Sequence, residues 1–169
     1  VAQKYDPRVE EFTLGGATFG VGLLAQSLSL PDGRVFFSGG LGPDGQPTDA
    51  AALYDPVTEQ TTTLTMNAKR AGHAAAVLNN GKVLITGGAG STGPILTTAL
   101  YDPATGAWTS GSLSTPRHAH TATLLTSGKV LVTGGQGRLS STSTSELYDP
   151  ATNTWTPGAS MSVARHAHT

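Results

Sequence analysis

The 169-residue chain contains no cysteine and little charge. Without cysteine it can form no disulfide, no thiolate nucleophile and no metal site built on sulfur. Charged residues make up 12% of the chain, about half of the roughly 25% usual in soluble domains, and the formal net charge is -1. Nucleic-acid binding depends on a basic excess that neutralises phosphates, so the composition predicts no nucleic-acid partner.

The sequence also lacks long apolar runs and motifs of common enzymes. No apolar stretch approaches the roughly 18 residues that a membrane-spanning helix needs, so we expect no membrane insertion. There is no Gly-x-Ser-x-Gly elbow, no phosphate-binding loop and no pair of acidic residues at a fixed spacing. We therefore predict a protein that is not an enzyme and holds no cofactor or metal. The low charge and the abundance of Thr, Ser, Gly and Ala favour an extracellular or cell-surface location.

Glycine is abundant, with 22 residues, and it recurs at a fixed period together with other markers. The Tyr-Asp-Pro triplets are separated by 49, 47 and 47 residues, and the Gly-Gly pairs by 48 and 47. Independent markers that share one period indicate a structural repeat. The triplets begin at Tyr5, Tyr54, Tyr101 and Tyr148, and the pairs at Gly39, Gly87 and Gly134.

Each repeat divides into four short segments, which we call a, b, c and d. In the second complete repeat they are residues 73–78, 82–86, 98–101 and 107–109. Asn80-Gly81 between a and b favours a tight hairpin, and Asp102-Pro103 between c and d favours a turn that the Asp side chain starts. Segment b is almost continuously apolar, which indicates burial on both faces. The pattern therefore predicts four-stranded antiparallel sheets that stack face to face. This is the architecture of the β-propeller, an all-β fold.

The order of these markers resembles the Kelch repeat, in which Gly-Gly is followed by Tyr and then by Trp. Here Tyr follows 13 or 14 residues after Gly-Gly, and Trp108 and Trp155 follow seven residues after Tyr. The resemblance implies a propeller, commonly of six or seven blades. Kelch propellers include protein-binding modules and a few enzymes such as galactose oxidase. The copper site of that oxidase uses a Cys-modified Tyr, which a chain without cysteine cannot form.

The repeats predict a single propeller segment over 1–169 with an incomplete ring. Residues 1–20 form half a blade (strands c and d), and residues 163–169 start another blade. Complete blades are expected at 21–63, 68–110 and 115–157. A total of about 3.6 repeats indicates a segment of a larger propeller. Two alternatives could complete the ring. One is the remaining blades of the larger propeller, and the other is a second copy of the same protein in a self-assembling pair.

Topology places the b–c and d–a loops on one face, here called face X, and the a–b and c–d turns on the opposite face Y. The b–c loops (41–49, 89–97 and 136–144) are long and differ among repeats. Variable loops on a rigid scaffold commonly carry binding, so we predict that face X binds a protein or a glycan. The candidate residues are Asp44, Gln46, Asp49, Ser91, Thr92, Ile95, Arg138 and Ser141.

Arginine and histidine recur just before segment a. The alternation of a strand would place His118 and His120 on one face, and likewise His166 and His168, and His-x-His can bind zinc or copper. All five histidines, however, occur in repeat register, and the first blade has Gly22 and Ala25 instead. We therefore interpret this group at the channel mouth as structural, hydrogen-bonded to neighbouring strands. It consists of Arg70, His73, Arg117, His118, His120, Arg165, His166 and His168.

Two other functions fit the same sequence. One is an enzyme of the galactose-oxidase-like class whose catalytic residues lie in blades outside this chain. The other is a purely structural spacer or assembly subunit. A scaffold that binds a partner through face X is the leading hypothesis.

Overall fold

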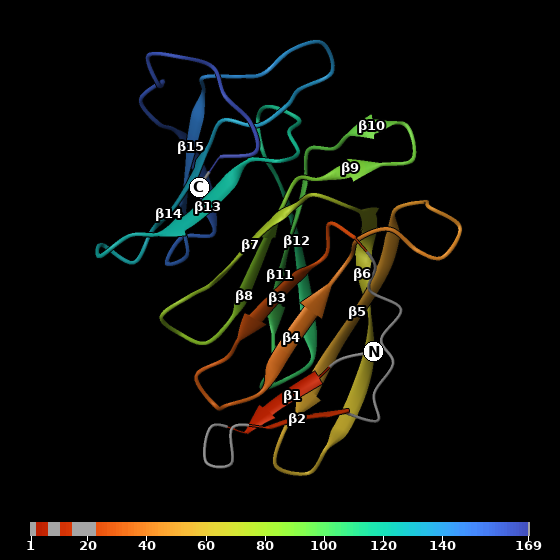
Figure 1. Cartoon of the computed structure of the whole chain (residues 1–169). Helices are drawn as coiled ribbons and strands as arrows, with labels where there is room; N and C mark the ends of the chain where they lie inside the picture. Colours follow the sequence, from red (N-terminus) through yellow and green to blue (C-terminus); the bar gives the residue numbers. More distant parts are fainter. Residues whose placement is uncertain (1–2, 7–10, 15–22, 169) are drawn as a thin grey trace.

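The computed structural model describes residues 3–6, 11–14 and 23–168, with side chains described for 23–168. Every regular element in this part of the chain is a strand, and three four-stranded antiparallel sheets dominate it (Figure 1). The first sheet contains β3 (Gln26–Ser29), β4 (Val35–Ser38), β5 (Thr48–Asp55) and β6 (Gln60–Arg70). The second contains β7 (Ala74–Val77), β8 (Val83–Thr86), β11 (Thr97–Asp102) and β12 (Ala107–Ser112). The third contains β13 (Thr121–Leu124), β14 (Val130–Thr133), β15 (Ser145–Asp149) and β16 (Thr154–Pro157).

Two short hairpins accompany the sheets. Strands β1 (Gln3–Asp6) and β2 (Glu11–Leu14) pair antiparallel within the region 1–20, the rest of which lies outside the described residues. Strands β9 (Ala89–Gly90) and β10 (Gly93–Pro94) form a small hairpin inside the second b–c loop. In the region 163–169, residues 163–168 contain no strand, and residue 169 lies outside the described part. No helix that could cross a membrane occurs among the described residues.

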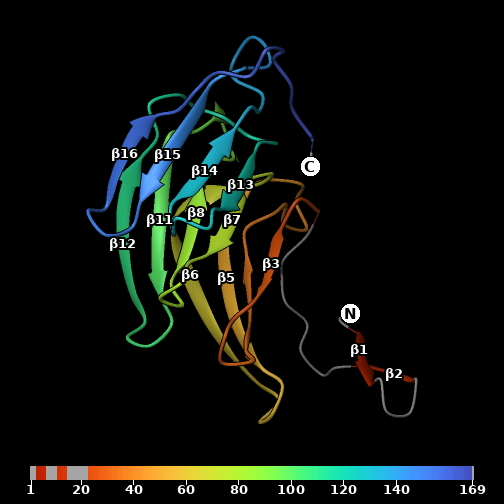
Figure 2. The same ribbon diagram turned by 90° about the vertical axis from the view of Figure 1, so that its left-hand side faces the viewer.

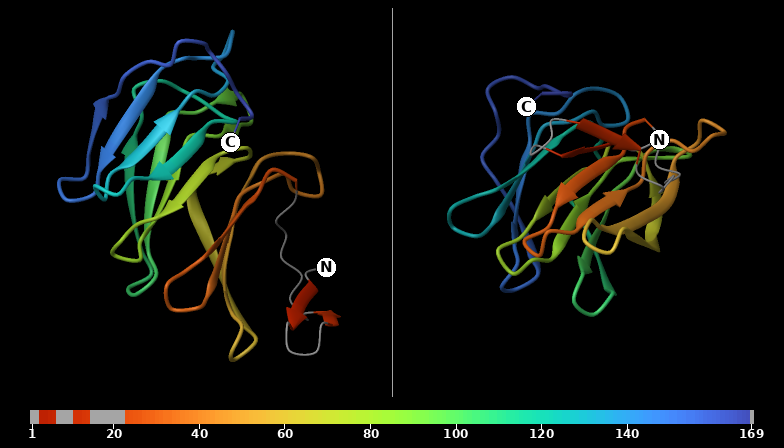
Figure 3. Two further views of the ribbon diagram at one scale, coloured as in Figure 1. Left: turned by 60° about the vertical axis from the view of Figure 1, so that its left-hand side comes forward. Right: turned by 60° about the horizontal axis from the view of Figure 1, so that its bottom comes forward.

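Each sheet is a meander in the order a, b, c, d, so it is one propeller blade. Neighbouring strands pair in register, with Val83 opposite Tyr101 and Tyr101 opposite Trp108. The first strands of the three blades form the inner edge, where β7 contacts β3 on one side and β13 on the other (Figure 2). The two views in Figure 3 show the blades fanned around this edge in an arc that does not close.

The core lies between the blades. All four residues of β8 are buried, as the apolar pattern of segment b predicts, because the middle blade is covered on both faces. Phe36 of the first blade stacks on Tyr101 of the second with 5.3 Å between ring centroids, and Tyr101 contacts Trp108 at 4.6 Å. A second cluster joins the second blade to the third, with Leu84 on one side and Val130 on the other. Each such fully buried aliphatic side chain contributes about 1.5–3 kcal/mol.

The Gly-Gly pairs lie where the backbone of one blade meets the next. A Cβ on Gly87 would lie within 3.0 Å of the Arg117 carbonyl oxygen and of the His120 ring. Gly87 also has a φ of +54°, a conformation that glycine adopts without the cost that other residues bear. The equivalent Gly39 and Gly134 face the same two kinds of neighbour. The pair therefore ends strand b where any side chain would obstruct the next blade.

Candidate functional site

Arg117 is fully buried at the boundary between the second and third blades. Its guanidinium donates to the carbonyl oxygens of Gly134 at 2.8 Å and Thr144 at 3.0 Å. It also pairs with Oε1 of Glu146 at 3.0 Å, and Glu146 is itself only 3% exposed. Meanwhile the Arg117 carbonyl accepts the Gly88 N–H of the second blade at 2.8 Å. One residue thus ties two blades together, by its main chain to one and its side chain to the other.

Arg70 repeats this arrangement one blade earlier, with a different partner for its second nitrogen. Its Nη1 donates to the carbonyl oxygens of Gly87 and Thr97, and its own carbonyl accepts the Gly40 N–H. Its Nη2 donates to Oδ1 of Asn67 at 2.8 Å, because Ala99 stands where the third blade has Glu146. Burial lowers the pKa of Arg70 to about 10, so it stays charged at neutral pH.

The histidines three residues later reach back to the preceding blade. His73 Nε2 lies 2.9 Å from the Ser38 hydroxyl, and His120 Nε2 lies 2.8 Å from the Thr86 hydroxyl. Thr86 Oγ1 donates to the Ala74 carbonyl, so it accepts from His120, whose proton is then on Nε2. Within the described part of the chain, the Nδ1 atoms of both rings have no hydrogen-bond partner, which suits the unprotonated nitrogen of a neutral imidazole. Through these contacts, His73 and His120 each join one blade to the preceding one.

The prediction that His118 and His120 share one face of a strand is wrong. Strand β13 begins only at Thr121, and Ala119 has a φ of +51°, so the alternation of an extended strand does not apply. His118 instead makes a single bridge with Gln136 of the b–c loop. Ala167 has a φ of +49° between His166 and His168, so the same correction holds for that pair.

Four residues with positive φ, one before strand a of each blade and one near the end of the chain, form a ladder of main-chain hydrogen bonds along the inner rim. The Gly72 N–H donates to the Leu24 carbonyl at 3.0 Å, Ala119 donates to Gly72 at 2.8 Å, and Ala167 donates to Ala119 at 2.8 Å. Each link joins one blade to the next. The left-handed turn at these positions therefore points each amide at the neighbouring blade.

The Arg and His group does not gather in one place. His120, Arg165 and His168 line a hollow of about 620 Å³ beside the inner strands, together with Gln26 and Thr121. Arg70, Arg117 and His73 are buried between blades instead. His166 Nδ1 is 2.8 Å from the Ser141 hydroxyl at the surface. His168 Nε2 makes a long contact of 3.5 Å with Thr121 Oγ1.

These histidines do not fit a metal centre. The Nε2 atoms of His73 and His120 are occupied by hydroxyl groups of two different blades, and the rings pack against glycine backbone. Among the residues that the structure describes, no group of three or more His, Asp or Glu side chains is placed to hold an ion.

Burial of these rings predicts a loss of stability in acid. Burial, and then the nearby arginine charge, lower the pKa of His73 and of His120 to about 3, well below the ordinary 6.5. The unfolded chain therefore binds protons between pH 6.5 and 3 that the folded chain does not. We expect the free energy of unfolding to be unaffected by these groups above pH 6.5 and to fall below it by about 1.4 kcal/mol per pH unit for each histidine.

Urea unfolding between pH 8 and pH 5 measures this effect. The variant His120→Asn keeps a polar side chain but does not titrate, so its stability should depend less steeply on pH. Equal slopes for the two proteins would contradict the assignment of His120 as a buried neutral ring.

The candidate residues of face X lie in or beside the three b–c loops. Asp44 and Gln46 are exposed in a turn, in which Asp44 Oδ1 accepts the Gln46 N–H at 3.0 Å, and Asp49 lies at an irregularity of β5. Ser91 and Thr92 form the exposed tip of the β9–β10 hairpin. The remaining three residues are Ile95, which packs over Gly90, the exposed Arg138, and Ser141, which contacts Gln136 and His166.

Sequence reasoning did not select the exposed apolar side chains of the same face. The b–c loops contain Leu139, which is 97% exposed, and Leu96, which is 39% exposed. The segments that lead into strand a contain Leu23, Leu24 and Val163, which are 60–79% exposed. Among the described residues, the sixth exposed large apolar side chain is Val57, in a c–d turn of face Y. Their position in or beside the loops of face X could have indicated them, but all the predicted residues except Ile95 are polar.

Comparisons with known proteins agree with this geometry. The family described as the Kelch motif matches residues 117–162. A novel fungal alcohol oxidase of the AA5 family, in complex with copper, has a similar structure over 83% of this chain and 31% of its own, with 24% identity and a TM-score of 0.64. The structure of YjhT is similar over 92% of this chain and 57% of its own, with 20% identity and a TM-score of 0.72. No curated protein matches the chain in sequence.

These likenesses bear on the fold, because the chain spans about a third of the oxidase and just over half of YjhT. They agree with the stacked four-stranded sheets and with the markers that the sequence repeats. The chain has the fold of a β-propeller with four-stranded antiparallel blades, in a ring that the described residues leave incomplete, and residues 117–162 match the Kelch motif.

Proposed function

We propose that the chain belongs to a non-enzymatic propeller scaffold that binds a partner protein through face X. The observation that carries the proposal is the exposure of large apolar side chains on the loops of this face, above all Leu139 at 97%. Exposed apolar groups on one face of a rigid scaffold favour a protein surface over solvent. Arg138 and Asp44 are exposed on the same loops and supply polar contacts at the rim of such an interface.

The contacts that hold neighbouring blades together do not involve the tips of the b–c loops, so the residues at these tips can vary without loss of the fold. The Arg117 and His120 contacts lie between blades, while the tips of the b–c loops extend beyond them. We infer an extracellular or cell-surface location from the low charge and the abundance of Thr, Ser, Gly and Ala.

A photo-crosslinking residue at position 139, compared with one at position 57, tests the proposal. Both positions are exposed apolar residues on loops, but they lie on opposite faces. With the surface fraction of the source cells, we expect a discrete crosslinked product from position 139 and none from position 57. The variant Leu139→Ser should weaken binding of that protein at least tenfold and change stability by less than about 0.5 kcal/mol. Crosslinking that is equal from both positions, or absent from both, would reject face X as the interface.

A further inference from the structure

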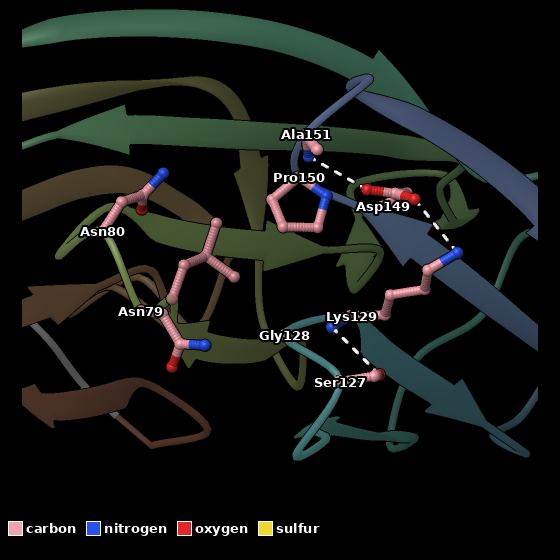
Figure 4. Close-up of a pocket in the computed structure, with 9 residues that line it drawn as sticks. Asn79, Asn80, Ser127, Gly128, Lys129, Asp149, Pro150 and Ala151 are labelled. Atoms are coloured by element: carbon pink, nitrogen blue, oxygen red, sulfur yellow. Dashed lines mark hydrogen bonds and ion pairs between the residues drawn. The ribbon is translucent and has the colours of Figure 1, made fainter.

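Face Y carries a groove at the boundary between the second and third blades. Its cavity of about 460 Å³ lies in the range of roughly 300–1,000 Å³ typical of small-molecule sites. Three turns line it: the a–b turn of the second blade and the a–b and c–d turns of the third (Figure 4). The residues are Leu78, Asn79 and Asn80, then Ser127, Gly128 and Lys129, and then Asp149, Pro150 and Ala151.

The first boundary has the same turns, but there an arginine crosses from one blade to the next. Arg34 is held by Asp32 through two hydrogen bonds of 2.9 and 2.7 Å. From there its Nη2 reaches the Pro103 carbonyl of the second blade at 3.2 Å. A guanidinium on a long side chain thus crosses from one blade to the c–d turn of the next.

Two substitutions in the repeat open the second boundary. Asn80 stands in the place of Asp32, and Lys82 in the place of Arg34. Asn80 has no charge to hold a cation, so Lys82 pairs with Asp102 of its own blade at 3.1 Å. Among the described residues, no side chain then crosses toward Pro150, the counterpart of Pro103, and the groove remains open.

The groove offers hydrogen-bonding groups without net charge. Lys129 Nζ and Asp149 Oδ2 are paired at 3.0 Å, so their charges cancel while both still hydrogen-bond at the rim. Asn79 and Asn80 are exposed on the opposite side, and their amide nitrogens have no partner among the described residues. The ring of Pro150 adds apolar surface, and Leu78 lies buried beneath the groove.

We infer that this groove is a binding site for a neutral saccharide, separate from face X. A pyranose presents hydroxyl groups that both donate and accept, which match the asparagine amides and the Lys129–Asp149 pair. It also presents a face of C–H groups that packs on the ring of Pro150. An ionic ligand would have to break the pair between Lys129 and Asp149, so the site favours uncharged sugars.

Saturation-transfer NMR of the full chain with methyl glycosides of glucose, galactose and mannose tests the site. We expect transfer to at least one glycoside at millimolar concentration. The double variant Asn80→Asp with Lys82→Arg recreates the arrangement of the first boundary, so it should fill the groove and reduce affinity at least tenfold. The first blade already accommodates this pair of residues, so the fold should be kept. The reciprocal variant Asp32→Asn with Arg34→Lys leaves this groove unchanged and should open a similar one at the first boundary, so it should retain or increase binding.

Asn79→Ala provides a second measurement that depends only on an exposed side chain, and it should reduce affinity at least threefold. The absence of transfer to all three glycosides would overturn the inference. Transfer that is unchanged by both Asn80→Asp with Lys82→Arg and Asn79→Ala would also overturn it, because the sugar would then bind elsewhere.

Discussion

Replacing Arg117 with methionine should destabilise the chain by about 3–5 kcal/mol, because it leaves a buried carboxylate without its partner. Glu146 is 3% exposed, and its oxygens otherwise accept only the main-chain N–H groups of Ser114 and Thr115 in the described structure. The carbonyl oxygens of Gly134 and Thr144 would also lose donors. Urea unfolding at pH 7 measures the loss.

The repeat supplies a matched control for this variant. Arg70 is equally buried and binds the equivalent carbonyls, but its side-chain partner is the uncharged Asn67. Arg70→Met removes hydrogen bonds without stranding a charge, so we expect a smaller loss, of about 1–3 kcal/mol. Adding Glu146→Gln to Arg117→Met should restore part of the stability. A loss from Arg70→Met as large as that from Arg117→Met would show that the Glu146 charge is not the cause.

The second large loss of stability is expected when a single methyl group is added at Gly87. Gly87→Ala places a Cβ against the Arg117 carbonyl and the His120 ring, at distances that real Cβ atoms do not adopt. Separating the backbones of two packed blades costs about 1–3 kcal/mol, and the positive φ adds roughly 1–2 kcal/mol. We expect a total loss of about 2–5 kcal/mol in the free energy of unfolding.

Gly81→Ala separates the two causes. Gly81 has a φ of +78°, but a Cβ there would meet no atom within 4 Å. It should therefore show only the backbone term of about 1–2 kcal/mol. Equal losses for the two variants would mean that the approach of the blades at Gly87 contributes nothing.

The sequence allowed the strands and turns to be predicted because their causes are local and repeated. Asp102 Oδ1 accepts the Ala104 N–H at 3.0 Å, and Asp149 does the same with Ala151, as expected for an Asp that starts a turn. The apolar run at 83–86 indicated burial on both faces, and β8 is buried throughout. Each of these patterns occurs in more than one repeat, so each prediction was supported by several copies of the same pattern.

The parts that depend on three-dimensional proximity were not predicted from the sequence. Strand alternation failed at Ala119, whose positive φ follows from a hydrogen bond to Gly72 in another blade. The pairing of Arg117 with Glu146 joins residues 29 positions apart that no periodicity connects. The groove on face Y results from Asn80 and Lys82, an exchange whose consequence appears only when the two boundaries are compared.

The ladder at the inner rim has a direction. In all three links the amide belongs to the later blade and the carbonyl to the earlier one, from Leu24 to Ala167. Successive blades are therefore related by one repeated rotation, and the two ends of the arc are different surfaces. Two arcs joined by this bond meet head to tail, because contact between like ends would place amide against amide or carbonyl against carbonyl. Assembly through the rim is thus heterologous, a geometry that makes a ring when the rotation closes.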